Sequence, residues 1–476
     1  MRKIVYSLLA GASILTASLS YSASASDLLT LYLKEGRATR VRLYPTDSVE
    51  CLRYSRFPGA DSVEGDSVEA DGFITLDILK NGGECDSYPL DSLIHYAFGT
   101  DIPTLRIATE EFVEEITSKT EYLKASFNAD CMGRYDDISD VAVNIRGRGN
   151  STWSYPKKPY RLKFDKKISL FGLPKAKSYA LIANHIDDTQ MRNAVAFRTA
   201  QLLDMPFTNH SIPVNVIFNG LYKGSYQLTE KIGINSGSVD IDEETGILWE
   251  IDTAYDEDFK FESPVYAMKV MVKDPDFTEL EEDDPSCSAD DRFEIWKADF
   301  VRMEKAVAEG RWTEEFDVDS MVDYILVYLF TGNREISWPK STYLYKTKIG
   351  EKYVMGPVWD FDWGFNFINP PDLFLLESFY VGMNFFFDIA KTPEFKHAFE
   401  KRWEWFKVNV YPQVMAYIDY YAAMIRVSAL RNGELWPLER NIYTTERFDD
   451  SVAAMKEWIE KRIEYIDNDP NHGLFR

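Results

Sequence analysis

Residues 356–366 read GPVWDFDWGFN and place two aspartates, Asp360 and Asp362, directly after a short apolar stretch. Side chains two positions apart in a β-strand point to the same face, so this spacing predicts that both carboxylates project to one side. Such a pair suits a hard divalent cation such as Mg²⁺, which takes carboxylate oxygens together with phosphates and water. Aspartates at a strand end also cap free backbone donors in turns, and this second interpretation stays open. Burying two charges among four aromatic neighbours is costly, which favours a cation or a basic partner.

A second informative segment, residues 145–164, reads IRGRGNSTWSYPKKPYRLKF and predicts a Gly-rich turn between two strands. Backbone N–H groups in such a turn are free to approach phosphate. The segment lacks the GxxxxGK[ST] spacing of a P-loop. Its basic residues mark it as the candidate anion site, and the alternative is a hairpin that only pairs with the acids of the chain. These basic residues are Arg146, Arg148, Lys157, Lys158, Arg161 and Lys163.

A third segment, residues 212–232, predicts a β-hairpin that turns at Asn219-Gly220, because this dipeptide adopts the positive φ angles of a tight turn. Glu230 lies at the end of its second strand. There it is placed to pair with a lysine of the basic segment or to contact the polar edge of a ligand.

The charge and the aromatic content of the chain exclude some classes of function and favour others. The chain has 476 residues, with 77 acidic against 53 basic side chains and a net charge of -24. Sequence-independent nucleic-acid binding needs many Lys and Arg on phosphates, so we expect no nucleic-acid partner. Aromatic residues make up 14% of the chain, which suits a large core and also glycan stacking.

The N-terminus has the pattern of an export signal. Arg2 and Lys3 precede a mostly apolar run over residues 4–19, and Ala23-Ser24-Ala25 follows as a cleavage site. We therefore expect residues 1–25 to be a signal peptide and the protein to be exported to the periplasm, the cell surface or the extracellular space. A membrane anchor is the alternative for this run, but no later apolar segment is long enough to span a membrane, which predicts no transmembrane segment in the mature chain.

The four cysteines, Cys51, Cys85, Cys131 and Cys287, form no CxxC pair, which excludes a zinc ribbon. Because an exported chain can form disulfides, a Cys51–Cys85 bridge is the preferred pairing. Free thiols are the alternative.

Strand and helix patterns predict an α+β protein with a β-rich half, a helical half and a cleft between them. The predicted domains are a small β-rich N-terminal module over residues 26–100, a connector with helical pieces over 101–140, a β-rich lobe from 141 to about 260, and a helical lobe from there to 476. Predicted helices cover residues 187–204, 292–308 and 319–331, and everything after residue 385.

The three segments together resemble the spore coat protein H (CotH) kinase family, over about residues 141–366. The family pattern has an RGN-S-W loop, a KK-x-Y-R-I-K-F strand, an R-N helix, an N-G-x-Y-x-G-x-Y-x-L-x-E hairpin and a strand that ends in W-D-x-D-W-x-F. The sequence carries these motifs in order at Arg148 to Trp153, Lys157 to Phe164, Arg192-Asn193, Asn219 to Glu230 and Trp359 to Phe365.

The resemblance implies an atypical protein-kinase-like, two-lobed fold and phosphoryl transfer from ATP, with Mg²⁺ or Mn²⁺, to a protein or extracellular substrate. It implies metal binding by Asp360 and Asp362 and a catalytic role for Asp360. It also implies nucleotide contacts for five residues: Arg148, Lys158, Arg161, Lys163 and Glu230.

The sequence departs from the family pattern at residues 332–345, GNREISWPKSTYLY. Glu335 stands nearest the family's catalytic Asp, and Ser341 nearest an Asn that binds a second metal, with one extra residue between them. We therefore take Glu335 as a catalytic candidate and Ser341 as a metal candidate. Because a Glu changes the reach of the proton acceptor, a catalytically inactive kinase-fold scaffold that binds a partner or a glycan is the alternative function. The oligomeric state stays open.

Overall fold

The computed structural model describes residues 15–17, 28–35, 38–45, 48–57, 73–98, 102–131, 134–365, 384–437, 448–469, 471–472 and 474. The chain divides into two compact units. One comprises Met1–Asp101 with Asp419–Ser428, and the other comprises Ile102–Ile418 with Ala429–Arg476.

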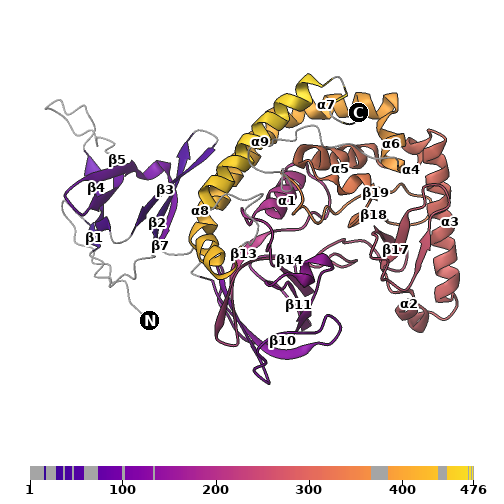
Figure 1. The fold of residues 1–476 in the computed structure, drawn as a ribbon, viewed down its shortest axis with the longest axis horizontal. Helices are drawn as coiled ribbons and strands as arrows, with labels where there is room; N and C mark the ends of the chain where they lie inside the picture. Colours follow the sequence, from indigo (N-terminus) through magenta and orange to yellow (C-terminus); the bar gives the residue numbers. More distant parts are fainter. Residues whose placement is uncertain are drawn as a thin grey trace, which may run out of the picture. The chain divides into compact units, whose positions relative to one another are not determined.

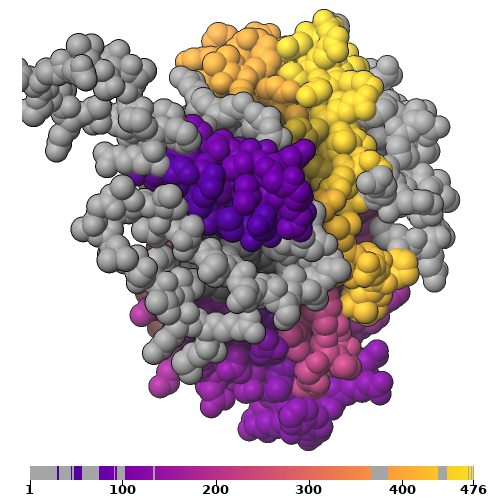
Figure 2. Space-filling model, turned by 90° about the vertical axis from the view of Figure 1, so that its left-hand side faces the viewer, coloured from indigo at the N-terminus to yellow at the C-terminus, as the bar shows by residue number. Residues whose placement is uncertain are grey.

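The first unit contains two small antiparallel sheets, whose described residues form the indigo cluster in Figure 2. Buried side chains from both sheets, such as Leu31, Leu52 and Ile78, form their common core. The first sheet has the order β1-β4-β5-β6, with β1 (Leu15–Ala17), β4 (Val49–Phe57), β5 (Phe73–Lys80) and β6 (Cys85–Pro89). The second has the order β3-β2-β7, with β3 (Ala38–Pro45), β2 (Leu28–Glu35) and β7 (Leu93–Phe98).

The predicted Cys51–Cys85 disulfide is wrong, since all four cysteines are free. Cys51 on β4 and Cys85 on β6 both pair with Leu79 of the strand between them. Two strand spacings, roughly 10 Å, therefore separate the two backbones, which is beyond the ~7 Å that a disulfide can bridge.

A seven-stranded closed barrel begins the second unit, in the order β10-β11-β12-β14-β13-β8-β9 (Figure 1). Alternate residues of its strands point inward and fill it with apolar and aromatic side chains, among them Phe127, Leu162 and Leu228. The strands are β8 (Thr104–Thr109), β9 (Leu123–Asp130), β10 (Ile138–Gly147), β11 (Tyr160–Ile168), β12 (Ala176–Ile182), β13 (Ile212–Phe218) and β14 (Leu221–Glu230).

The barrel confirms the hairpin at Asn219-Gly220, where both residues have positive φ angles. The helical pieces predicted within residues 101–140 are wrong. In their place β8 pairs in parallel with β13, and β9 pairs with β10, which closes the barrel. The partner of β8 lies more than a hundred residues away in the sequence, and this pairing overrides the helix-forming composition of the segment.

A five-stranded sheet, in the order β16-β17-β15-β18-β19, follows the barrel in the same unit. Figure 1 shows the long helix α3 (Ala289–Ala308) beside this sheet, and an edge-to-face contact between the rings of Trp249 and Phe300 joins the two. The strands are β15 (Ile247–Ile251), β16 (Lys260–Glu262), β17 (Lys269–Asp274), β18 (Thr342–Lys346) and β19 (Val354–Met355).

Helices α1, α7 and α9 contact α5, of which nearly every residue is buried. The predicted helices at 292–308 and 319–331, and the helical character of the described residues after 385, are confirmed. The helices are α1 (Arg192–Leu202), α2 (Phe277–Asp283), α3 (Ala289–Ala308), α4 (Trp312–Glu315), α5 (Val318–Thr331), α6 (Phe385–Ala390), α7 (Pro393–Asn409), α8 (Tyr411–Leu435) and α9 (Phe448–Asn468).

Helix α1 begins later than predicted, and neither Asp187 nor Asp188 is its N-cap. Instead both carboxylates form ion pairs with Arg192, at 3.0 and 2.9 Å. The Asp187 carboxylate also accepts the Arg192 backbone N–H, so it fixes the start of the helix from the preceding turn.

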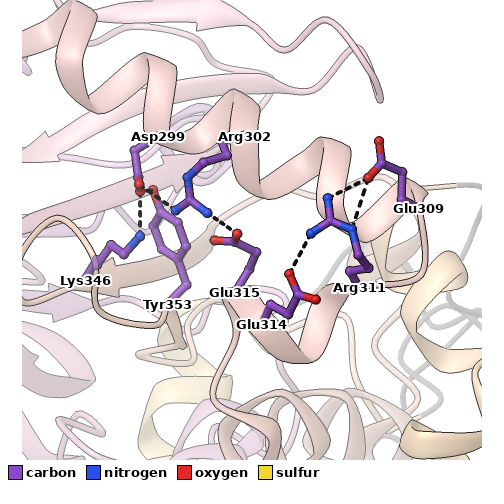
Figure 3. Close-up of polar contacts among 8 residues, drawn as sticks. All are labelled: Asp299, Arg302, Glu309, Arg311, Glu314, Glu315, Lys346 and Tyr353. Carbon is purple, nitrogen blue, oxygen red and sulfur yellow. Dashed lines mark hydrogen bonds and ion pairs between the residues drawn. The ribbon is translucent and has the colours of Figure 1, made fainter.

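A polar network ties α3 to the five-stranded sheet (Figure 3). Asp299 on α3 accepts hydrogen bonds from the buried Lys346 ammonium at 2.7 Å and from the Tyr353 hydroxyl at 2.8 Å. Towards the surface, Arg302 joins Asp299 to Glu315 of α4. The buried end of this network fixes the position of β18, which leads out of the candidate site described below.

These observations confirm a mixed α+β fold, to which the structure adds a barrel that the sequence did not predict. None of the helices in the described part of the chain has the length and apolar character needed to cross a membrane.

Candidate active site

A cavity of about 500 Å³ lies within the second unit, a size typical of small-molecule sites. Arg161 and Ala180 of barrel strands line it from one side. Glu250 and Tyr343, which belong to the five-stranded sheet, line it from the other. Asp360 and Asp362 also line it, so the structure brings the acidic pair and the basic segment of the sequence into one cavity.

The cavity is rich in basic side chains although the chain is strongly acidic. Eight basic residues and six acidic residues line it, against 53 and 77 in the whole chain. Six of the basic side chains form no ion pair with a carboxylate among the described residues. Lys119 and Arg146 donate to backbone carbonyls. The other four are Arg148, Lys157, Arg161 and Lys231. Cations without partners in a chain with surplus acid indicate a site for an external anion.

Lys157 is the most unusual of these cations because its side chain is completely buried. Its ammonium donates to the Ser225 carbonyl and lies 4.4 Å from the centre of the Tyr226 ring. Burial without a counter-charge lowers the pKa of Lys157 well below its usual range. Keeping such a group costs stability, so an anion that restores its charge would bind favourably.

The other three unpaired cations surround the same space. The Arg148 guanidinium lies 5.5 Å from the centre of the Trp359 ring, and the Arg161 Nε atom is buried with no hydrogen-bond partner. Burial, together with the charges of Arg161 and Lys273, lowers the pKa of Lys231 to about 8. These groups are arranged as donors for a multiply charged ligand such as a polyphosphate.

Asp360 and Asp362 reach the cavity by a different route from the predicted one. Strand β19 ends at Met355, and the aspartates lie in the irregular segment that follows, with Asp360 at a φ of 65°. Two asparagines hold this segment. Asn193 of α1 accepts the Phe361 N–H at 2.7 Å, and Asn333 donates to the Asp360 carbonyl at 3.0 Å. Strand alternation is therefore not what brings the two carboxylates together.

The acidic pair has the electrostatics of a site that favours a cation. Burial, followed by the charges of Asp360 and Glu335, raises the pKa of Asp362 well above its usual range. The described residues contain no preassembled group of three or more metal-ligating side chains. Two carboxylates are nevertheless a suitable donor set for Mg²⁺ or Mn²⁺, because these ions complete their coordination with water and substrate phosphates.

Glu335 follows α5 in a short 3₁₀ turn, Arg334–Ser337, which is capped by Asn333. It does not line the cavity itself, but it forms an ion pair of 3.2 Å with Lys340, which does. The second carboxylate oxygen of Glu335 is buried with no hydrogen-bond partner. Burial and the charge of Asp360 raise the pKa of Glu335 well above its usual range, while Lys340 opposes the shift.

Ser341 lines the cavity and bonds to a residue that the sequence analysis did not single out. Its backbone N–H and hydroxyl both donate to one oxygen of Asp252, at 2.8 and 3.2 Å. Asp252 directly follows β15 and lines the cavity opposite the barrel. The charges of Glu335, Asp360 and Asp252 outweigh the effect of burial on Lys340 and raise its pKa.

Three predicted nucleotide contacts do not line the cavity. Lys158 donates to the Trp153 carbonyl at 2.8 Å, and Lys163 lies 6.0 Å from the centre of the Tyr122 ring. Glu230 lines a separate pocket, where its carboxylate binds the His210 ring at 2.6 Å and accepts the His210 N–H at 2.9 Å. Arg148, Arg161, Ser341, Asp360 and Asp362 are the predicted residues that do line the cavity.

Sequence reasoning named Lys157 as a member of the basic segment but did not choose it as a nucleotide contact. Lys157 lies just before β11 and lines the cavity together with Pro159 and Arg161. Among the cavity residues that the sequence analysis did not single out are Lys231, Asp252 and Lys340, whose local sequence carries no comparable signal.

Comparison with known proteins agrees with this geometry. No curated protein matches the chain. The family described as CotH kinase protein matches residues 145–466, a range that contains most of the cavity residues and both asparagines that hold the acidic segment. Since this match covers more than half of the sequence, the chain belongs to the CotH kinase family.

Proposed function

We propose that this protein is an exported kinase that transfers a phosphoryl group from ATP, with Mg²⁺ or Mn²⁺, to a hydroxyl of a protein or other extracellular substrate. The observation that carries the proposal is the set of unpaired cations that share one cavity with Asp360 and Asp362. Membership of the CotH kinase family supports a kinase-related activity.

The cavity also supports a kinase-like division into two lobes. Strand β11 and the connection from β10 to it supply Arg148, Lys157 and Arg161, whereas β15 and the segments that follow β15 and β19 supply the carboxylates. A nucleotide with its phosphates between these two halves would satisfy the basic side and approach the acidic side at once.

In this proposal the cations bind and orient the phosphates. The buried Lys157 and the unpaired Arg161 donate to phosphate oxygens, and Arg148, which faces Asp360, donates near the acidic end. Asp360 and Asp362 would hold the divalent ion, which supplies positive charge to the phosphate oxygens as charge develops on them.

Glu335 is the proposed proton acceptor. The substrate hydroxyl oxygen forms a bond to the terminal phosphorus while the bond from that phosphorus to the bridging oxygen breaks, and ADP leaves with the bond's electrons. The hydroxyl proton passes to the unpartnered oxygen of Glu335. A raised pKa suits this role because it brings the base closer to the pH at which the enzyme works.

Calorimetry with Mg-ATP and Mn-ATP tests nucleotide binding. Wild-type protein should bind, and Asp360→Ala should lose the metal-dependent part of binding while it keeps its fold, because removal of one of two neighbouring carboxylates relieves repulsion. The matched control is Glu351→Gln, which changes an exposed carboxylate on the turn before β19. If the wild-type protein binds neither complex at millimolar concentration, the kinase proposal is excluded. The catalytically inactive scaffold then remains as the function.

Autophosphorylation with labelled ATP tests the transfer step. Glu335→Gln should keep nucleotide binding and lower the transfer rate by ~10²-fold or more. Nucleotide binding without any transfer by the wild-type protein would identify a nucleotide-binding pseudokinase instead.

A further inference from the structure

Lys340 lies among carboxylates on the acidic side of the cavity. It belongs to the segment between the 3₁₀ turn of Glu335 and strand β18, in which the chain departs from the family pattern. Its ammonium is 3.2 Å from Glu335, its side chain is partly exposed, and it lines the cavity. Asp252 and Asp360 also line this side of the cavity, so one lysine faces three carboxylates.

The same part of the site leaves little for a second metal ion to bind. Ser341 stands at the position where the sequence pattern predicted a further ligand. Its backbone N–H and hydroxyl both donate to a single oxygen of Asp252, so that oxygen is already occupied by two hydrogen bonds. One Glu335 oxygen is engaged by Lys340. A divalent ion entering here would meet a fixed positive charge at ion-pair distance, and the two would repel.

We propose that Lys340 is an internal cation that takes the place of a second divalent ion between Glu335, Asp252 and Asp360, so that this chain binds one divalent ion per nucleotide. The inference rests on the proposed function and adds the metal count to it. Asp360 and Asp362 remain the ligands of the single ion. Lys340 is a positioning residue that keeps Glu335 in place and balances the charge of the acidic side without a metal.

Electron paramagnetic resonance of Mn²⁺, in the presence of the non-hydrolysable β,γ-imido analogue of ATP, counts the bound ions. Only ions lost in Asp360→Asn are counted, because Asp360 borders both metal positions, and this removes the background from the acidic surface. The wild-type protein should bind one Mn²⁺ per nucleotide. Lys340→Gln should bind two, because loss of the ammonium exposes three carboxylates to a second ion. Lys340→Arg, which keeps the charge, should again bind one.

Lys119→Gln is the matched control. Lys119 lines the same cavity, but its ammonium donates to the Gly149 carbonyl at 3.0 Å, and it forms no ion pair in the described part of the chain. Its removal should leave the count at one. Thermal unfolding with Mn²⁺ alone gives a readout that needs no nucleotide: Mn²⁺ should raise the melting temperature of Lys340→Gln more than that of the wild type.

Two ions on the wild-type protein, or one ion on both the wild type and a folded Lys340→Gln, would overturn the inference while leaving nucleotide binding intact. A wild-type protein that binds no Mn²⁺-nucleotide at all would remove the proposed function together with the inference. If Lys340→Gln fails to fold, the number of Mn²⁺ ions on the wild-type protein still tests the inference, because two ions per nucleotide would overturn it.

Discussion

Burial decides which of two adjacent lysines serves the candidate site. The resemblance to the family led us to Lys158, but this side chain is bonded to the Trp153 carbonyl outside the cavity. Lys157, its neighbour, is completely buried, lines the cavity and has no carboxylate partner. A sequence records that two lysines are adjacent, whereas the direction of each side chain depends on the conformation of the segment that leads into β11.

The two lysines form a matched pair for mutation. Lys157→Met should weaken Mn-ATP binding by about 10- to 100-fold, the value of one or two charged hydrogen bonds, while raising the stability of the free protein because an uncompensated buried charge is removed. Lys158→Met should change nucleotide affinity little. Calorimetric titration and thermal unfolding measure the two effects. Equal losses of affinity in both variants would contradict the assignment.

Lys231 makes nucleotide affinity depend on pH. Burial lowers its pKa to about 8, so the free protein carries this charge at pH 7 and largely loses it at pH 9. Phosphate binds the charged form, and affinity should therefore fall by roughly 10-fold between pH 7 and pH 9. Lys231→Arg stays charged over this range and should flatten the profile. A wild-type affinity that is constant from pH 7 to pH 9 would argue against phosphate contact by Lys231.

At the scale of elements, the sequence correctly predicted those whose signals lie within one segment. It failed where a contact with another segment decides the structure. The hairpin at Asn219-Gly220 and the helices α3 and α5 follow from local turn chemistry and periodicity. The start of α1 differs because Asp187 pairs with Arg192 instead of capping the helix. The acidic segment was expected on a strand, but Asn193 and Asn333 hold it in an irregular conformation that its own sequence does not specify.

The network between α3 and β18 supplies a test of how firmly these elements are joined (Figure 3). Asp299→Asn should destabilise the protein by about 3–5 kcal/mol, because it leaves the completely buried Lys346 without its counter-charge. Arg311→Ala changes an exposed ion pair of the same region and should have little effect. Urea unfolding of both variants measures the difference. A similar small change in both would show that Lys346 finds another partner.

At the scale of the whole molecule, the sequence predicted a cleft between a β-rich and a helical half. The acidic pair and part of the basic segment line one cavity, whereas Glu230 lines a separate pocket. The sequence did not predict the closed barrel. Residues 101–140, interpreted as a connector, contribute β8 and β9, which complete that barrel. The family match begins at residue 145, inside β10, and so it does not include these strands.

Removal of β8 and β9 should therefore destabilise the barrel. A chain that begins at residue 141 leaves β10 and β13 each with an unpaired edge, and it should aggregate. A chain that begins at residue 102 keeps all seven strands and should stay soluble in the oligomeric state of the full chain. Size-exclusion chromatography and circular dichroism compare the two. Cooperative unfolding of a monomer that begins at residue 141 would show that the barrel does not need β8 and β9.

The parallel pairing of β8 with β13 also sets an order of events during synthesis. Thr104 pairs with Asn215, so the first strand of the barrel waits for a partner more than a hundred residues later in the chain. At ribosomal rates this interval is roughly 5–20 s, which is long compared with the microseconds in which a hairpin forms. β9 and β10 can pair with their sequence neighbours at once, but the barrel cannot close before β13 emerges. The growing chain therefore has to be protected from other exposed strands throughout this interval.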